Sequence, residues 1–251
     1  MAIKHIQTSH LVHDLKNPSN IIETGARALL EKKDRYGPLS PKQERVIRRM
    51  LRSALKVKNL ANCMLEVDMA TRGIKRVRDC TMSDVLKTAL IEVFDLVDPT
   101  VSDALESAED LEVFRRVLGE HQIYLDADDK EISRAIRIDE TKLSLVITNL
   151  LSNALKYKEK SIFLKCSSQG NSVNVSVKDD GPGIPESYHE QIFDQYFQCV
   201  EVEGFPVRGH GLGLAGALAL TQALGGRLYL CKSDHGAEFV VEVTLSDETS
   251  M

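Results

Sequence analysis

The N-terminal third of the chain holds two long stretches in which apolar residues recur at helical spacing. At about 100° per residue, the first set falls within one narrow sector of a helix. Its members are Leu11, Leu15, Ile22, Ala26 and Leu29. Gly37-Pro38 follows and breaks the pattern, because neither residue continues a helix well. The first stretch is therefore predicted to be one helix.

A second helix is predicted to start at Ser40-Pro41, an N-cap residue followed by proline at the first helical position. It ends at Thr71-Arg72-Gly73. Its apolar face has two rows, which are Ile47, Met50, Ala54, Val57, Ala61 and Met64, and beside them Leu51, Leu55 and Leu65. Two faces this wide exceed what one antiparallel hairpin can bury. We therefore expect a homodimer in which two helical hairpins form a four-helix bundle.

The charge of the chain is divided along its length. Residues 1–78 carry 17 Lys and Arg against 7 Asp and Glu, whereas residues 79–251 carry 15 against 30. Such a division predicts two domains with different surfaces, 1–78 and 79–251. No basic run is interleaved with aromatic residues, so we expect no nucleic-acid partner.

The remaining composition excludes several classes of protein. With 43% hydrophobic residues the chain has ample material for a core. No stretch has the roughly 20 uncharged apolar residues of a membrane helix, and the charged start is unlike a signal peptide. The five cysteines are odd in number and have no C-x-x-C spacing. We therefore expect a cytoplasmic protein with reduced thiols, no membrane segment and no structural zinc.

One histidine of the first predicted helix lies opposite the apolar stripe. His13 should face solvent, with Asp14 adjacent and Asn17 on the same polar side. Pro18 lies inside the helix, where proline costs about 3 kcal/mol. A lone exposed histidine is usually only a surface residue, so its neighbours decide its interpretation.

The middle of the chain is acidic and predicts structure more than chemistry. Thr81 begins a helix that Asp98-Pro99 interrupts. A surface helix is expected around Ala104–Leu118. Short strands are expected at 122–126 and 133–138, with a turn between them.

Three segments of the C-terminal part carry polar groups suited to a nucleotide. A helix capped by Asp139 has a buried stripe of Leu143, Ile147, Leu150 and Ala154, and the other side presents Asn149, Asn153, Lys156 and Tyr157. Amide oxygens are suitable Mg²⁺ ligands and a lysine suits phosphate. Two Asn residues four apart are by themselves weak evidence, because solvated polar residues are the default.

The second segment follows the predicted strand 172–178 and runs from Asp179 to Pro185. A carboxylate at a strand end can accept a hydrogen bond from an exocyclic amine, while glycines let the backbone approach a flat ring. A plain turn is the simpler interpretation of any D-x-G-x-G. The third segment, Gly209–Leu214, leads into an apolar helix and offers backbone N–H groups to phosphates. Its spacing matches neither a Walker loop nor a Rossmann fingerprint.

In this order, the segments resemble the motifs of sensor histidine kinases. His13–Pro18 resembles the H box in its H-D-x-K-N-P form. The other four matches are Asn149–Tyr157 to the N box, Asp179–Pro185 to the G1 box, Ile192–Phe197 to the F box and Gly209–Leu214 to the G2 box. The resemblance extends from about residue 9 to residue 245. It implies a helical dimerisation domain followed by an α/β sandwich of the GHKL (Bergerat) type.

The resemblance also implies an activity. A histidine kinase core autophosphorylates, here at His13, from ATP·Mg²⁺ and passes the phosphoryl group to an aspartate of a response-regulator receiver domain. Asp14 would fix the imidazole tautomer. Asn17 resembles the position that orients water for dephosphorylating the regulator.

The nucleotide-binding residues are carried over in the same way. Asn153 would bind Mg²⁺, with Asn149 and Lys156 supporting metal or phosphate. Around the adenine, Tyr157 would flank the ring, Asp179 would read its amine, and Gly181 and Gly183 would make room. Residues 198–208 would form a lid that ends at the phosphate-binding glycines Gly209, Gly211 and Gly213.

Two features depart from the family pattern. Ala237 stands where the family usually has Ser or Thr, which puts one water-mediated adenine contact in doubt. Nothing before His13 resembles a sensor, so we expect either an excised core or a kinase that another protein activates.

Two other functions remain open at this stage. A GHKL ATPase of the gyrase kind would need a glutamate at position 149, where this chain has Asn149. A phosphotransfer adaptor with a vestigial ATP fold would have no need for Asn153, Asp179 and the glycine loops.

Overall fold

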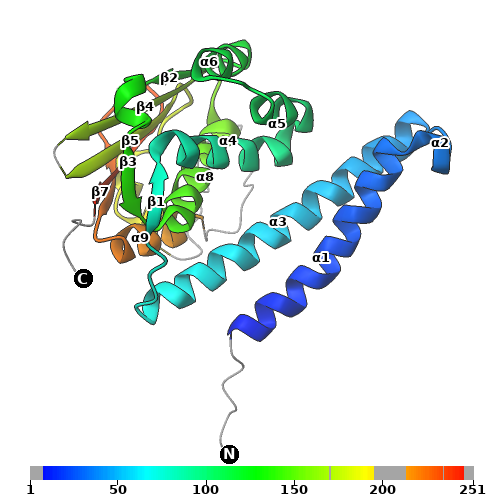
Figure 1. Ribbon diagram of the computed structural model, residues 1–251, viewed down its shortest axis with the longest axis horizontal. Helices are drawn as coiled ribbons and strands as arrows, with labels where there is room; N and C mark the ends of the chain where they lie inside the picture. Colours follow the sequence, from blue (N-terminus) through cyan, green and yellow to red (C-terminus); the bar gives the residue numbers. More distant parts are fainter. Residues whose placement is uncertain (1–7, 170, 195–212, 234, 246–251) are drawn as a thin grey trace, which may run out of the picture. The chain divides into compact units, whose positions relative to one another are not determined.

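The computed structural model describes residues 8–169, 171–194, 213–233 and 235–245 (Figure 1). The chain divides into two compact units between Arg72 and Gly73. This division lies before the charge boundary at 78 and 79. Residues 73–77 go with the second unit because their backbone is bonded to it, for example through the Arg76 N–H that donates to Asp139 at 2.9 Å.

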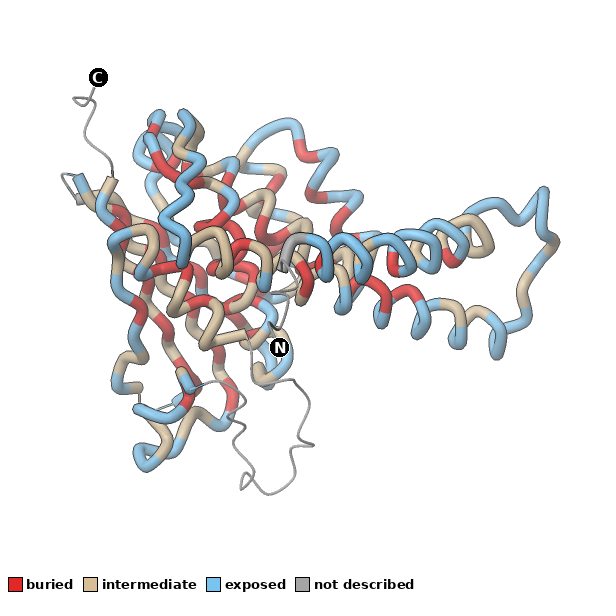
Figure 2. Tube along the Cα trace, turned by 90° about the horizontal axis from the view of Figure 1, so that it is seen from below, coloured by how far each residue is buried: buried red, intermediate tan, exposed pale blue. Residues whose placement is uncertain are grey.

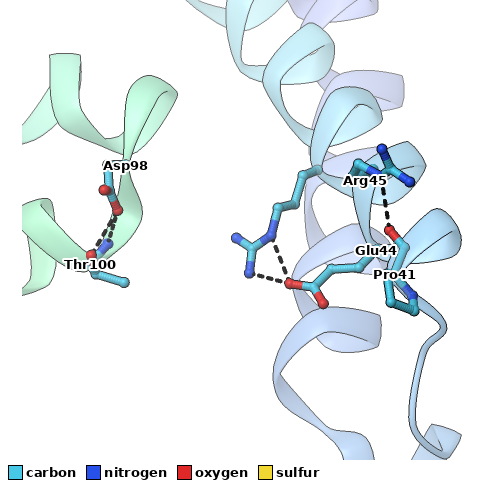
Figure 3. A network of polar contacts seen from close by, with 6 residues as sticks. Pro41, Glu44, Arg45, Asp98 and Thr100 are labelled. Atoms are coloured by element: carbon cyan, nitrogen blue, oxygen red, sulfur yellow. Dashed lines mark hydrogen bonds and ion pairs between the residues drawn. The ribbon is translucent and has the colours of Figure 1, made fainter.

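The first unit is a helical hairpin. Its helices are α1 (Thr8–Glu31), the single turn α2 (Lys33–Tyr36) and α3 (Pro41–Thr71). The predicted start of α3 is confirmed, because the Ser40 hydroxyl accepts from the Gln43 N–H while the Gln43 side chain accepts from the Ser40 N–H. Further along the first turns, Glu44 pairs with Arg48 and Arg45 donates to the Pro41 carbonyl (Figure 3).

Only part of each predicted apolar stripe is buried in the hairpin. The buried apolar residues are Val12 and Ala26 of α1, and Leu51, Ala54, Leu55 and Ala61 of α3. The exposed ones include Leu11, Leu15 and Ile22 of α1, and Met50, Val57 and Met64 of α3. The predicted secondary row of α3 thus supplies much of the hairpin core. A half-buried ion pair also joins the helices, because Lys58 donates to Glu23 at 2.9 Å.

The second unit is an α/β sandwich, as predicted. Its N-terminal half contains β1 (Arg78–Thr81), α4 (Met82–Val97), α5 (Pro99–Glu106), α6 (Leu111–Glu120), β2 (Ile123–Asp126), α7 (Asp129–Ile132) and β3 (Ala135–Ile138). Its C-terminal half contains α8 (Glu140–Tyr157), β4 (Ile162–Gln169), β5 (Ser172–Asp179), the short 3₁₀ turns η1 (Glu186–Tyr188) and η2 (Gln191–Phe193), α9 (Gly213–Ala223), β6 (Arg227–Cys231) and β7 (Glu238–Thr244).

A five-stranded sheet forms one layer of this unit, in the order β2-β4-β5-β7-β6. β2 runs parallel to β4 and the other pairs are antiparallel. Val173, Val175 and Val177 of the central β5 are buried, and α8 and α9 pack on the sheet. Figure 2 shows the buried residues gathered along these strands and helices. β1 and β3 form a separate antiparallel pair.

The acidic middle segment differs from the prediction. Instead of one helix around Ala104–Leu118, two helices are present, because Asp110 caps a new helix at Leu111. α5 is likewise capped by Asp98, which accepts from the Thr100 N–H and hydroxyl (Figure 3). The predicted turn after β2 contains the start of α7. The segment is more than a surface layer, since Leu105, Phe114 and Leu118 are fully buried.

This burial predicts a large effect of truncation in α6. Leu118 is 0% exposed, so Leu118→Ala should lower the free energy of unfolding of the second unit by about 2–5 kcal/mol. Denaturant titration measures the change. Val97→Ala, at a side chain that is 56% exposed, is the matched control and should change it by less than about 0.5 kcal/mol. Equal effects of the two substitutions would contradict the packing described here.

Candidate functional site

The polar residues singled out on α8 lie on its solvent side. The helix is capped by Asp139, and the predicted stripe of Leu143, Ile147, Leu150 and Ala154 is buried. Asn149 and Asn153 are half-buried on the opposite side. The Asn149 amide N–H donates to the Leu145 carbonyl at 2.9 Å. This hydrogen bond orients the amide, whose oxygen is the atom suited to ligating a metal.

Gly213, the first residue of α9, lies close to this part of α8. A Cβ at position 213 would lie 3.3 Å from Asn149 Oδ1. The glycine therefore allows the N-terminus of α9 to approach an amide oxygen closely. Gly209, Gly211 and the lid expected at 198–208 lie outside the described residues, as does the end of the F-box match.

Two residues at the C-terminal end of α8 form a local pair. The Lys156 ammonium lies 4.3 Å from the centre of the Tyr157 ring, and its Nζ is 2.5 Å from the Tyr157 hydroxyl oxygen. Lys156 is exposed and Tyr157 is half-buried. The cation and the ring thus lie together at the surface, at the C-terminal end of α8.

Asp179 ends the central strand β5 with its carboxylate inside the protein. The residue is 4% exposed, and Oδ1 accepts from the backbone N–H groups of Gly181 at 2.9 Å and Ala237 at 3.3 Å. Burial raises the pKa of this carboxyl above its ordinary value, although the two backbone hydrogen bonds oppose the shift. The group is a buried acceptor held in a fixed orientation.

The glycines around Asp179 are required by the protein's own packing. A Cβ on Gly181 would lie 2.2 Å from the Tyr157 carbonyl oxygen, and one on Gly236 would lie 1.7 Å from the Asp179 carbonyl oxygen. Gly183 and Gly236 also have φ near +74°, which L side chains rarely adopt. The sequence predicts that Gly181 and Gly183 make room for a ring, a role that this packing neither requires nor contradicts. Sequence reasoning did not identify Gly236, whose only signal is its place before Ala237.

Asp180 has a structural task that sequence reasoning also missed. Its carboxylate accepts from three successive backbone N–H groups, those of Glu159, Lys160 and Ser161, at 2.9–3.2 Å. Burial tends to raise the pKa of Asp180, but the backbone hydrogen bonds outweigh it and the pKa is lowered. The residue ties the loop after α8 to the end of β5. The second Asp of the D-D-G run was its only signal.

His13 lies on α1 of the first unit and faces solvent, as predicted. Its side chain is 71% exposed and that of Asp14 is 78% exposed. Asn17 Nδ2 lies 3.3 Å from His13 Nδ1, and Asp14 Oδ1 lies 3.6 Å from the same nitrogen. These neighbours make opposite demands on Nδ1, because an amide N–H needs a lone pair there and a carboxylate needs a proton.

α1 continues through Pro18. Ser19, which is buried, donates from its hydroxyl to the Leu15 carbonyl at 2.9 Å. This bond satisfies the buried hydroxyl but does not replace the one that Pro18 cannot donate to the Asp14 carbonyl. The helix therefore presents His13 and Asn17 on one surface despite the proline.

These arrangements suit two kinds of chemistry. The exposed imidazole is an accessible nucleophile. The second unit offers a buried acceptor, amide oxygens and helix N-terminal N–H groups, the set that a purine nucleotide and its phosphates need. Among the described residues, no group of three or more His, Cys, Asp or Glu is arranged to hold a metal. Amide oxygens together with nucleotide phosphates are the donors that fit a Mg²⁺ ion here.

The comparison with protein families identifies the second unit. Residues 138–247 match the histidine kinase-, DNA gyrase B- and HSP90-like ATPase family. The second unit is therefore similar in sequence to the ATPase domain of this family, and the chain as a whole is similar to histidine kinases. The match includes α8, β5 and Asp179, but covers neither α1 nor α3.

Relatives of known type match across both units. Sensor histidine kinase YkoH of Bacillus subtilis is 27% identical over 237 residues, which are 94% of this chain and 46% of YkoH. Sensor histidine kinase GlrK of Escherichia coli is 27% identical over 249 residues, 98% of this chain and 47% of GlrK. The chain thus spans less than half the length of these relatives.

Two solved structures share the fold. The crystal structure of full-length ShkA in complex with AMPPNP has a TM-score of 0.60 and 23% identity, and covers 97% of this chain and 46% of that one. The Acinetobacter baumannii histidine kinase AdeS has a TM-score of 0.54 and 14% identity, and the match covers 94% of this chain and 98% of the AdeS chain. In the described residues, no helix has the length and apolar character needed to cross a membrane.

The buried carboxylate of Asp179 predicts a trade between stability and binding. Because its pKa is raised, ionisation above that pKa costs folding free energy. Asp179→Asn keeps the Oδ1 acceptor and removes the charge, so the ligand-free protein should gain about 1 kcal/mol, or about 2–4 °C in Tm. Calorimetric affinity for ADP should fall at least about tenfold, since an amide N–H₂ replaces an acceptor. A lower Tm with unchanged affinity would contradict this interpretation of the site.

Proposed function

We propose that this chain is the catalytic core of a two-component sensor histidine kinase. It autophosphorylates on His13 from ATP and transfers the phosphoryl group to an aspartate of a response-regulator receiver domain. Residues 1–72 serve as the dimerisation and phosphoacceptor domain, and 73–251, rather than the 79–251 expected from the charge, as the ATP-binding domain. The observation that carries the proposal is the solvent-facing His13, with Asp14 and Asn17 at its Nδ1, in the same chain as the Asp179 site.

The second unit binds the nucleotide in this proposal. Asp179 accepts a hydrogen bond from the adenine amine, and the backbone at Gly181 and Gly183 lies against the ring. Tyr157 flanks the adenine. Asn149, Asn153 and Lys156 serve the phosphates, with Asn153 as the Mg²⁺ ligand. Gly209, Gly211 and Gly213 offer backbone N–H groups to the phosphates. Mg²⁺, when bound, neutralises phosphate charge during transfer.

The first unit supplies the nucleophile. Nε2 of His13 attacks the γ-phosphorus in line, the N–P bond forms, and the bond to the ADP oxygen breaks as ADP leaves. The proton stays on Nδ1, where Asp14 stabilises the imidazolium that results. Asn17, one helical turn away, orients water when the phosphorylated regulator is bound, which gives the core a phosphatase activity.

Two residues argue against the two alternative functions. Asn149 cannot act as the general base of a hydrolytic ATPase, because an amide does not accept a proton at neutral pH. A phosphotransfer adaptor would not need a buried Asp179 with a raised pKa, since that arrangement costs stability. The free described cysteines fit the reducing cytoplasm that we propose as the location.

The exposed apolar rows of the hairpin support a homodimer. Leu15 is 37% exposed, Met50 51% and Met64 40%, although α1 and α3 already pack together. An isolated helical pair with such rows is an incomplete core. A second hairpin that buries them would give the four-helix bundle expected from the sequence.

Labelling with γ-labelled ATP and Mg²⁺ tests the activity. The wild-type chain should acquire label that is acid-labile and base-stable, and His13→Gln should acquire none. Asn17→Ala should retain the label, because its proposed role is in dephosphorylating the regulator, and should slow that reaction at least about tenfold. Absence of wild-type label despite nucleotide binding would overturn the kinase proposal.

Sedimentation tests the dimer. Replacing Leu15 and Met64 with Lys places charges on the exposed rows and should convert a dimer to a monomer at micromolar concentration. The hairpin should stay helical, because the buried residues Val12, Leu51 and Leu55 are unchanged. Lys42→Ala and Arg52→Ala, on exposed polar positions of α3, are the controls. A wild-type monomer at that concentration would count against the bundle.

A further inference from the structure

A buried ion pair lies at the first turn of α8, away from the nucleotide residues. Asp139 is 2% exposed and Lys142 is 1% exposed, and the Lys142 ammonium donates to Asp139 Oδ2. Asp139 also accepts from the Lys142 backbone N–H at 3.3 Å, which makes it the N-cap of the helix. Neither residue touches the proposed reaction.

The pair holds the segment that leads from α3 into the second unit. The Lys142 ammonium also donates to the Ile74 carbonyl at 3.1 Å, and the Arg76 N–H donates to Asp139 Oδ2 at 2.9 Å. Next to them, the Arg78 guanidinium pairs with Glu140 at 2.7 Å. Residues 74–78 are thus attached to the first turn of α8 at three successive alternate positions.

The attachment point also lies beside the end of α9. A small cavity at the pair is lined by Lys75 and Val77 of the segment, and by Ala223 and Leu224 at the end of α9. Asn149 on α8 and Gly213 at the start of α9 approach each other farther along the same two helices. The segment is therefore bonded to one of the two helices that present the proposed phosphate-binding groups and lies beside the end of the other.

Stability alone is a poor explanation for this pair. Removing two charges from water is costly, and apolar residues of similar volume often stabilise a fold as well or better. Apolar burial does little to hold the segment, because residues 73–76 are exposed. The ion pair instead supplies directional bonds to the backbone at Ile74 and Arg76, where apolar packing would supply none.

We propose that Asp139 and Lys142 are positioning residues that fasten residues 74–77 to the ATP-binding unit, so that the freely jointed connection from α3 is confined to Arg72 and Gly73. Gly73, with φ of +71°, lies directly after α3 and before the first fastened residue. The inference rests on the proposed function, since its role is to keep the tether between His13 and the bound nucleotide short.

The length of the tether sets the size of the effect. Arg78 stays held by its pairing with Ile138 in the β1–β3 ladder, so releasing residues 74–77 lengthens the free connection from about two residues to about six. Effective concentration falls roughly as the −3/2 power of length, which gives about a fivefold slower transfer to His13. The change should lower the rate of phosphoryl transfer at saturating ATP and not the affinity for ATP, because the nucleotide site itself is unchanged.

The test uses the full chain carrying Asp139→Asn and Lys142→Met together. Asn remains a good N-cap, but its N–H₂ replaces the acceptor that the Arg76 N–H needs, and Met removes the donor to Ile74. Removing both charges avoids leaving one buried and unpaired. The matched control is Asp126→Asn with Lys165→Met, an exposed pair of the same unit at 3.6 Å.

Three measurements are made on wild type, double variant and control. Hydrogen exchange reports the amides of residues 74–77, calorimetry gives the affinity for ADP·Mg²⁺, and single-turnover labelling gives the rate at His13. We expect faster exchange, affinity within about twofold, and a transfer rate lower by about fivefold, only in the double variant.

Every other outcome contradicts either the fastening role or the proposed function. Unchanged exchange, or a transfer rate equal to or above that of wild type, overturns the fastening role. Affinity that falls in parallel with the rate also overturns it, because the pair would then be a structural support of the nucleotide site. If wild type itself acquires no label at His13, the proposed function fails, while exchange still decides whether the pair fastens the segment.

Discussion

The start of the second unit depends on the carboxylate of Asp139, which joins α8 to the chain segment that precedes β1. It caps α8, accepts the Arg76 N–H, and pairs with the buried Lys142 ammonium. Burial raises the pKa of Asp139, but the hydrogen bonds from Lys142 and the backbone outweigh burial and lower it. A lowered pKa means that the contribution to stability is complete above the ordinary value of 3.8 and is lost as pH falls through the folded value. The start of α8 is therefore insensitive to pH across the neutral range.

Two adjacent carboxylates at the end of β5 have different roles. Asp180 is partly exposed, accepts three backbone N–H groups, and has a lowered pKa. Asp179 is buried and has a raised pKa. Neighbouring residues of one type are thus driven in opposite directions by burial and by the number of donors. The exposed one fixes the loop after α8, so the buried one keeps its orientation without the help of a ligand.

Local signals in the sequence were sufficient for the starts of helices and for the central strand. Ser40, Thr81 and Asp139 cap helices through residues two or three positions away, and the alternating valines of β5 indicate their own burial. The order of polar motifs likewise placed Asn149 and Asp179 on the correct elements.

Features that depend on distant partners were not predictable in this way. Which row of α3 would be buried depends on the position of α1 against it, so Met50 and Leu51 are equivalent until the hairpin forms. From the sequence, Lys142 would be predicted to be a solvated residue of its helix, because its partner at Ile74 is 68 positions away. The pairing of β1 with β3 and the steric need for glycine at 236, next to Asp179, also arise only when separate segments meet.

The hairpin separates the residues that hold it together from those that it leaves exposed. Val12, Leu51 and Leu55 are buried between α1 and α3, whereas Met50 and Val57 lie in a different row of α3. A substitution in the outer row leaves the internal packing of the hairpin intact. In the proposed dimer, substitutions in the outer row would therefore change which hairpins pair without changing how each hairpin folds.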